Sequence, residues 1–221
     1  MFVKTKPFVQ ACFLLLALFF LASCKTTKNK FFNKAYHKTT TRYNWYFNAK
    51  ESYKSGVNRL ETQHKDDFNE LLSIYPLGTD RDAQSISPQM DKALKKCAQA
   101  ISKHSMLIKG KEFNRWIDDC YLLIGKAYFY KKEHIKALEA FRLVSRQFEG
   151  LKSSYEAKIW LVKSFVETKD LSSADLILED ILSDEDFPAE LNKELSLVMA
   201  HYHIRQKDFY PAIMELEEAI S

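Results

Sequence analysis

The chain has 221 residues, of which 46% are hydrophobic and 28% charged, a composition that excludes a disordered chain and suits one or two folded domains. It contains only five glycines and five prolines, too few for the many tight turns of an all-β fold, so helices are favoured. The net charge is +4, yet residues 1–50 contain no acidic side chain, so the remainder is mildly acidic. An acidic body argues against a nucleic-acid-binding fold, which would present a basic face.

Residues 1–23 have the organisation of a bacterial lipoprotein signal peptide. Lys4 and Lys6 precede an apolar run at 8–21, which is shorter than the roughly 20 residues of a membrane span. The run ends in Leu-Ala-Ser before Cys24, which matches the lipobox. The resemblance implies cleavage before Cys24 and lipidation of this residue, so that acyl chains hold the protein on a membrane. The alternatives are an uncleaved anchor and an ordinary signal peptide with a chance cysteine.

Residues 24–41 are polar, basic and without helical periodicity, which predicts a flexible tether. Its basic charge could contact anionic headgroups, although a solvated linker is the simpler interpretation. No acidic residue follows Cys24 directly, as would be usual for surface-exposed lipoproteins of Bacteroidota. This favours a location that faces the periplasm.

Residues 42–111 are predicted to form an N-terminal helical segment. Apolar residues three or four apart predict a first helix over 43–63, and its aromatic start fits either a capped core or, less simply, a binding platform. A loop is expected over 76–87. Ser87 and Pro88 have the pattern of an N-cap followed by proline at the first helical position, which predicts that the next helix begins there.

Cys97 and Cys120 are the two cysteines that follow Cys24. If 88–104 and 112–130 form an antiparallel helical hairpin that turns near Lys109, the two thiols lie at similar height. An exported pair of this kind could form a disulfide. The other interpretation is two buried, unpaired thiols at helix-packing positions.

Three helix pairs repeat in register over residues 112–221. The small residues Ala137, Ala174 and Ala212 occupy the same position in each second helix, at spacings of 37 and 38 residues, slightly above the tetratricopeptide period of about 34. The repeats span about 118–151, 155–188 and 193–221, the last incomplete. We therefore expect an all-α protein, a right-handed helix-pair solenoid of tetratricopeptide repeats preceded by extra N-terminal helices.

One stripe on each first helix repeats the order acid, aliphatic, basic, apolar, and 3-4-3 spacing keeps its members on one side of the helix. In such domains this stripe lines the concave groove that takes peptides or helices, so we hypothesise a partner segment with acidic and apolar groups. The alternative is that acids favour the first turn of a helix and that the lysines are solvated. The candidate residues are Asp119, Leu122, Lys126 and Phe129; Glu156, Ile159, Lys163 and Val166; Glu194, Leu197, His201 and Ile204.

No catalytic or metal site is predicted. His201 and His203 would diverge by about 200° on a helix and cannot share an ion. The acidic pair Asp118-Asp119 has diverging side chains, and no phosphate-binding loop, nucleophile elbow or zinc-protease motif is present. We expect a protein without enzymatic activity, catalytic residues, cofactor or small-molecule substrate.

The chain resembles the N-terminal part of the PorW/SprE-type tetratricopeptide lipoproteins of Bacteroidota, which belong to the type IX secretion and gliding motility machinery. The residues that carry this resemblance are YHKTTTRYNWYFNA at 36–49, IYPLG at 74–78, SPQMDKA at 87–93 and WIDD at 116–119. Trp45 departs from the glycine that is common in the family. Members are much longer, whereas this chain stops inside the last helix, so we expect a truncated product or an end covered by a partner.

The resemblance implies an outer-membrane lipoprotein that faces the periplasm and links the translocon to the periplasmic ring of the secretion apparatus. Its partners would be proteins of the secretion and motility machinery, with the membrane reached through the lipid anchor and no nucleic acid bound. The runner-up is a BamD-like outer-membrane assembly lipoprotein, which has the same kind of anchor and similar repeats. A periplasmic enzyme would need a catalytic constellation that the sequence lacks.

Overall fold

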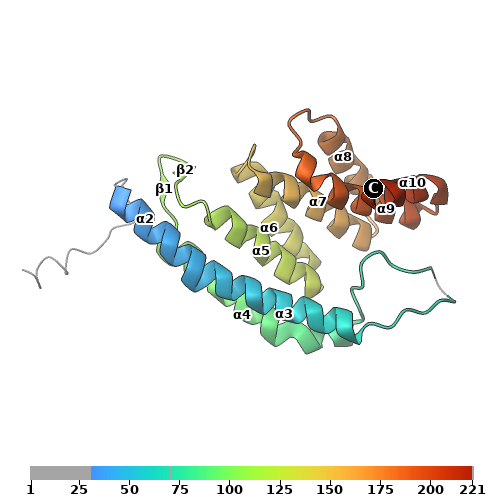
Figure 1. Cartoon of the computed structure of the whole chain (residues 1–221), viewed down its shortest axis with the longest axis horizontal. Coiled ribbons are helices and arrows are strands. Elements are labelled where there is room, and N and C mark those ends of the chain that lie inside the picture. The colour runs from blue at the N-terminus through green and yellow to red at the C-terminus, as the bar shows by residue number, and fades with distance from the viewer. Residues whose placement is uncertain (1–30, 70, 221) are drawn as a thin grey trace, which may run out of the picture.

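The computed structural model describes residues 31–69 and 71–220; the signal peptide, Cys24 and residues 24–30 of the predicted tether lie outside them. Packed helices form most of this part of the chain, and the one sheet described there has two short strands (Figure 1). The predicted all-α helix-pair repeat fold is therefore confirmed.

An extended helical rod precedes the repeats. It consists of α2 (Phe31–Thr40), the π-helix η1 (Thr41–Tyr46) and α3 (Phe47–Gln63), which follow one another without a break. The rod lies along α4 (Asp80–His104), as Figure 1 shows. Ala49 and Leu60 of the rod are buried, as are Met90 and Ala93 of α4, so an apolar seam holds the two together.

The prediction of a flexible tether is wrong for residues 31–41, which are helical. The reason is that buried polar side chains, rather than apolar ones, attach this segment to the rest of the protein. Asn33, His37 and Thr41 are at most 7% exposed and lie on its buried side. A pattern of apolar residues could not reveal a helix that docks through buried polar groups.

The predicted start of the next helix at Ser87 is also wrong, because α4 begins at Asp80 and residues 80–87 are helix rather than loop. Thr79 is the N-cap, in a capping box in which its Oγ1 accepts from the Asp82 N–H at 3.3 Å and the Asp82 carboxylate accepts from the Thr79 N–H at 2.7 Å. Pro88 lies inside the helix. An interior proline costs one backbone hydrogen bond and crowds the carbonyl four residues earlier, yet the helix continues through it and begins at the capping box.

A short β-hairpin connects α4 to the repeats. Its strands are β1 (Leu107–Ile108) and β2 (Lys111–Glu112), and Lys109 and Gly110 between them both have positive φ, as a tight hairpin turn requires. The Glu112 carboxylate accepts from the Ser105 hydroxyl at 2.6 Å and from two backbone N–H groups at 2.8 Å. The hairpin thereby places the chain for the first repeat.

Three helix pairs follow the hairpin, in the predicted register. They are α5 (Ile117–Tyr130) with α6 (His134–Gln147), α7 (Lys152–Glu167) with α8 (Leu171–Leu182), and α9 (Asn192–Gln206) with α10 (Phe209–Ile220); the 3-10 turn η2 (Ala189–Leu191) precedes the last pair. Within each pair the turn contains a lysine with φ near +60°, at Lys132, Lys169 and Lys207. The three turns are thus copies of one another, a repeat signal that the search for small and apolar residues missed.

The core of the repeats is built around aromatic rings on α5, α6 and α7. Phe141 stacks on Trp160 with ring centroids 5.7 Å apart, and Phe129 meets Trp160 edge-on at 5.3 Å. Gly125 makes room for this cluster, since a Cβ there would lie 2.5 Å from the Phe141 ring. The small residue of the predicted packing face is therefore required by the close approach of α5 and α6.

Cys97 and Cys120 are buried side by side among small residues, and both are free thiols. A hydrogen bond that the Cys120 thiol donates to the Cys97 side chain, together with burial, raises the pKa of Cys120 well above its ordinary range. The expectation that the antiparallel helices α4 and α5 bring the two thiols together is correct, but the disulfide is not formed. They pack as small apolar groups, which is the alternative that the sequence left open.

Candidate partner-binding groove

The basic members of the predicted stripe come together across the three repeats. Lys126 of α5 and Lys163 of α7 lie 5.2 Å and 4.4 Å from the centroid of the same Trp160 ring. Tyr75 connects Lys163 to His201 of α9, because its ring lies 3.3 Å from Lys163 Nζ and 5.4 Å from the His201 ring. The stripe is therefore one continuous surface.

The chain itself covers the middle of this surface. Tyr75 belongs to the loop 64–79, which joins α3 to α4 and reaches the C-terminal repeats beside α9 (Figure 1). Leu77 packs against the core of the repeats, and Leu71 and Ile74 line a hollow of about 300 Å³ together with Ile204. We call this loop the plug. The groove that the sequence predicts thus holds an extended segment of the same chain.

Lys163 is buried beneath the plug, with only 5% of its surface exposed. The faces of Tyr75, Trp160 and Phe129 surround its ammonium group, and no ion pair of the described residues involves it. Burial lowers the pKa of Lys163 to about 7, an effect that Glu194 opposes. Lys163, which was predicted to be solvated or to face a partner, is thus buried and enclosed by aromatic rings.

The neighbouring charged members of the stripe are paired. Lys126 Nζ lies 3.1 Å from Glu156, and His201 Nε2 lies 3.2 Å from Glu167. Burial, reinforced by the carboxylates of Asp118 and Glu156, raises the pKa of Asp119 to about 6. Lys126 of the first repeat therefore pairs with Glu156 of the second, whereas His201 pairs with Glu167, which lies outside the stripe.

The apolar members divide into two groups. Leu197 and Ile204 of α9 are partly exposed and remain accessible beside the plug. The other four are buried in the packing between helices, so they contribute to stability rather than to an open surface: Leu122, Phe129, Ile159 and Val166.

Tyr75 is the lining residue that the sequence analysis did not assign to the groove. Its signal was the apolar IYPLG segment at 74–78, inside a connection otherwise rich in polar residues. Such a segment has to be buried against something, but periodicity in the loop cannot say against which of the helices. Only the path of the chain places it on α7 and α9.

The segment 36–49 that carries the family resemblance forms a buried polar network with α4. Trp45 Nε1 donates to His104 Nε2 at 3.1 Å, so His104 carries its proton on Nδ1 and donates it to His37 Nδ1 at 2.9 Å. Asn114 donates from its amide to Thr41 Oγ1 at 2.8 Å. The network requires both imidazoles to be neutral, because a second proton on either ring would remove an acceptor.

Acidification is therefore expected to weaken the docking of α2. Burial lowers the pKa of His37, and burial together with His37 lowers that of His104, so below pH 6.5 these two imidazoles bind more protons in the unfolded chain until their lowered pKa values are reached. Their contribution to the melting temperature should fall as the pH decreases from 6.5 to 5, and His37→Gln should reduce this contribution.

The surface His64→Gln variant serves as control, since His64 is exposed. Asp119 titrates near pH 6 with the opposite sign, so the comparison has to be between variants and not between absolute slopes. If the melting temperatures of the original chain and of His37→Gln depended equally on pH, the assignment of this effect to His37 would be contradicted.

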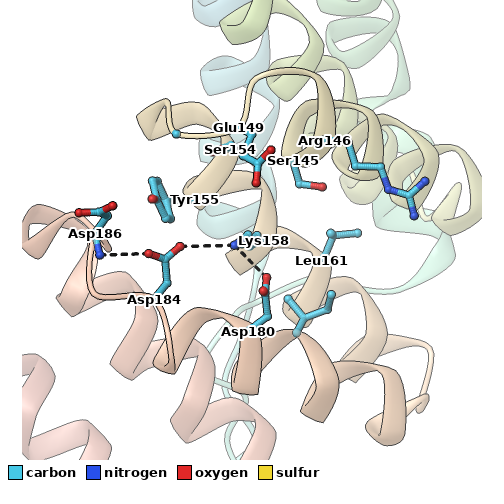
Figure 2. Close-up of a pocket in the computed structure, with 12 residues that line it drawn as sticks. Ser145, Arg146, Glu149, Ser154, Tyr155, Lys158, Leu161, Asp180, Asp184 and Asp186 are labelled. Carbon is cyan, nitrogen blue, oxygen red and sulfur yellow. Dashed lines mark hydrogen bonds and ion pairs between the residues drawn. The ribbon is translucent and has the colours of Figure 1, made fainter.

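A separate hollow of about 540 Å³ lies between α6, α7 and α8, away from the plug. Figure 2 shows Lys158 between two acidic side chains, with distances of 2.8 Å to Asp180 and 3.8 Å to Asp184. The acidic charge in this hollow is thus partly neutralised by the chain itself. It is a second depression, with a mainly polar lining.

Within residues 31–69 and 71–220, no cluster of histidine, cysteine, aspartate or glutamate could hold a metal ion. Among the helices of that same part, none has both the length and the apolar character needed to cross a membrane. Neither a protein-family model nor a curated protein matches the chain. Fold and site together define a helix-pair repeat protein in which a loop of the same chain packs on the predicted stripe.

Proposed function

We propose that this chain is a periplasm-facing scaffold of the outer membrane, anchored through lipid on Cys24, that joins components of the type IX secretion and gliding machinery by protein–protein binding. The contact between the Tyr75 ring and the Lys163 ammonium group is the observation that supports a binding function. An extended segment with an aromatic ring already occupies the groove, so a partner segment of the same chemistry has a site to enter. The choice of secretion system rests on the sequence resemblance at 36–49, 74–78, 87–93 and 116–119.

A partner that uses this groove competes with the plug. The apparent affinity is reduced by the fraction of molecules in which the plug covers the groove. The partner therefore needs an aromatic or aliphatic group to replace Tyr75, and an acidic group to pair with Lys126 when Glu156 is displaced.

Crosslinking of the full chain in cells, followed by identification of the bound proteins, tests whether partners bind in the groove. Tyr75→Ala should raise the recovery of type IX components several-fold, and Lys126→Glu should lower it by a similar factor. Tyr210→Ala on α10 is the matched control, since Tyr210 is an exposed aromatic residue that is not a member of the stripe.

Recovery of β-barrel assembly factors in place of type IX components would select the BamD-like alternative. If both variants keep the helical circular dichroism spectrum and neither changes the recovery of partners, the groove is not the binding site. Cys24→Ala tests the anchor separately, because a variant that is still processed and firmly membrane-bound is incompatible with lipidation at that residue.

A further inference from the structure

The N-terminal rod presents a largely exposed face of basic and aromatic side chains, in which Lys34 is half-buried over the Phe113 ring. We call it the basic–aromatic face. Phe31, Lys34, Lys38 and Arg42 follow one another at spacings of three and four, so they share one side of the rod. Tyr43 flanks them, with 57% of its surface exposed, and Phe31 is 78% exposed.

Residues just before α5 complete this face. Arg115 and Trp116 line a hollow of about 470 Å³ together with the rod, and its lining contains no acidic residue. The Arg42 guanidinium lies 4.9 Å from the Tyr43 ring and 5.3 Å from the Trp116 ring. These stacking contacts hold the cation in place without neutralising it.

The four cations of the face lack acidic partners. None of the ion pairs in the described part of the chain includes them, and no acidic residue occurs before Glu51. Elsewhere in the described residues, by contrast, lysines at 126, 131, 152 and 158 pair with carboxylates. The positive charge of this face is therefore available to an anionic partner.

We propose that the basic–aromatic face docks on an anionic membrane surface, with Lys34, Lys38, Arg42 and Arg115 at headgroup phosphates and with Phe31 and Tyr43 in the interfacial layer. Basic side chains beside exposed aromatic rings are the combination that binds such surfaces. The proposal deepens the proposed function, since Phe31 is seven residues from Cys24, a distance that an extended chain spans in at most about 25 Å. The docking would orient the rod on the membrane and direct the repeats away from it.

Photocrosslinking of the full chain in vesicles tests the docking. A p-benzoylphenylalanine in place of Tyr43 should form lipid adducts in vesicles that contain phosphatidylglycerol, at about five times the yield found in pure phosphatidylcholine or in high salt. The same residue in place of Tyr210, which is 76% exposed on α10, is the matched control and should give few adducts in either vesicle. All variants are reconstituted alike, so the difference reports this face and not the anchor.

Lys38→Glu combined with Arg42→Glu should reduce the adduct yield at position 43 about tenfold. Both side chains are exposed, and circular dichroism verifies the helix. Equal yields at positions 43 and 210, or a yield independent of the anionic lipid, would overturn the proposal. Crosslinks from position 43 to a protein in cells would also overturn it. Recovery of groove partners should be unchanged in this variant, so failure here is distinguishable from failure of the scaffold function.

Discussion

Replacement of Lys163 by methionine is expected to stabilise the protein. An ammonium group that is 5% exposed and has no carboxylate partner loses its hydration on folding, and methionine fills a similar volume without that loss. Replacement of buried charged groups by well-packed apolar side chains of similar volume is often neutral or stabilising, by up to about 4 kcal/mol. Chemical denaturation at pH 7 should give an increase of this order in the free energy of unfolding.

The pH dependence identifies Lys163 as the cause. Its pKa is about 7 in the folded chain and 10.5 when exposed, so between these values the unfolded chain binds more protons. The stability of the original chain should therefore rise from pH 7 towards pH 10, by at most about 1.4 kcal/mol per pH unit. In Lys163→Met this rise should disappear.

Lys126→Met is the matched control, because it removes a lysine of the same stripe that has a carboxylate partner. It should leave the alkaline rise in place and should not stabilise, since Glu156 loses its partner. A Lys163→Met variant that is less stable than the original chain would mean that the three aromatic rings hold the ammonium group more strongly than burial disfavours it.

Truncation of Phe141 to alanine is expected to be the most destabilising single change in the repeats. Its ring is fully buried, stacks on Trp160 and fills the space above Gly125. Loss of a buried phenylalanine costs about 3–5 kcal/mol, because the cavity that it leaves collapses only in part. Urea unfolding should show the midpoint shifted accordingly.

Phe209→Ala is the comparison for this experiment. Phe209 begins α10 and is 50% exposed, so its truncation should cost less than about 1 kcal/mol. Similar losses for the two variants would show that the Phe141 site does not organise the packing between the first and second repeats.

The sequence by itself determined the helix pairs and their register. Ala137, Ala174 and Ala212 lie within the predicted second helices because small residues at a fixed spacing report contacts between neighbouring helices. Such contacts depend on residues close in sequence, so local periodicity carries the information. The same local signal misplaced the start of α4, where Thr79 and Asp82 were overlooked beside the more obvious Ser87-Pro88 pair.

Only the tertiary structure decided what the stripe faces. Lys163 is caged by Tyr75, which is 88 residues earlier in the chain, and α2 docks through buried contacts of His37 with His104. Both contacts join segments whose relative path depends on the whole fold, and both use polar or aromatic groups that leave no periodic trace. The sequence therefore predicts a groove, and the path of the loop 64–79 determines that the groove is already filled.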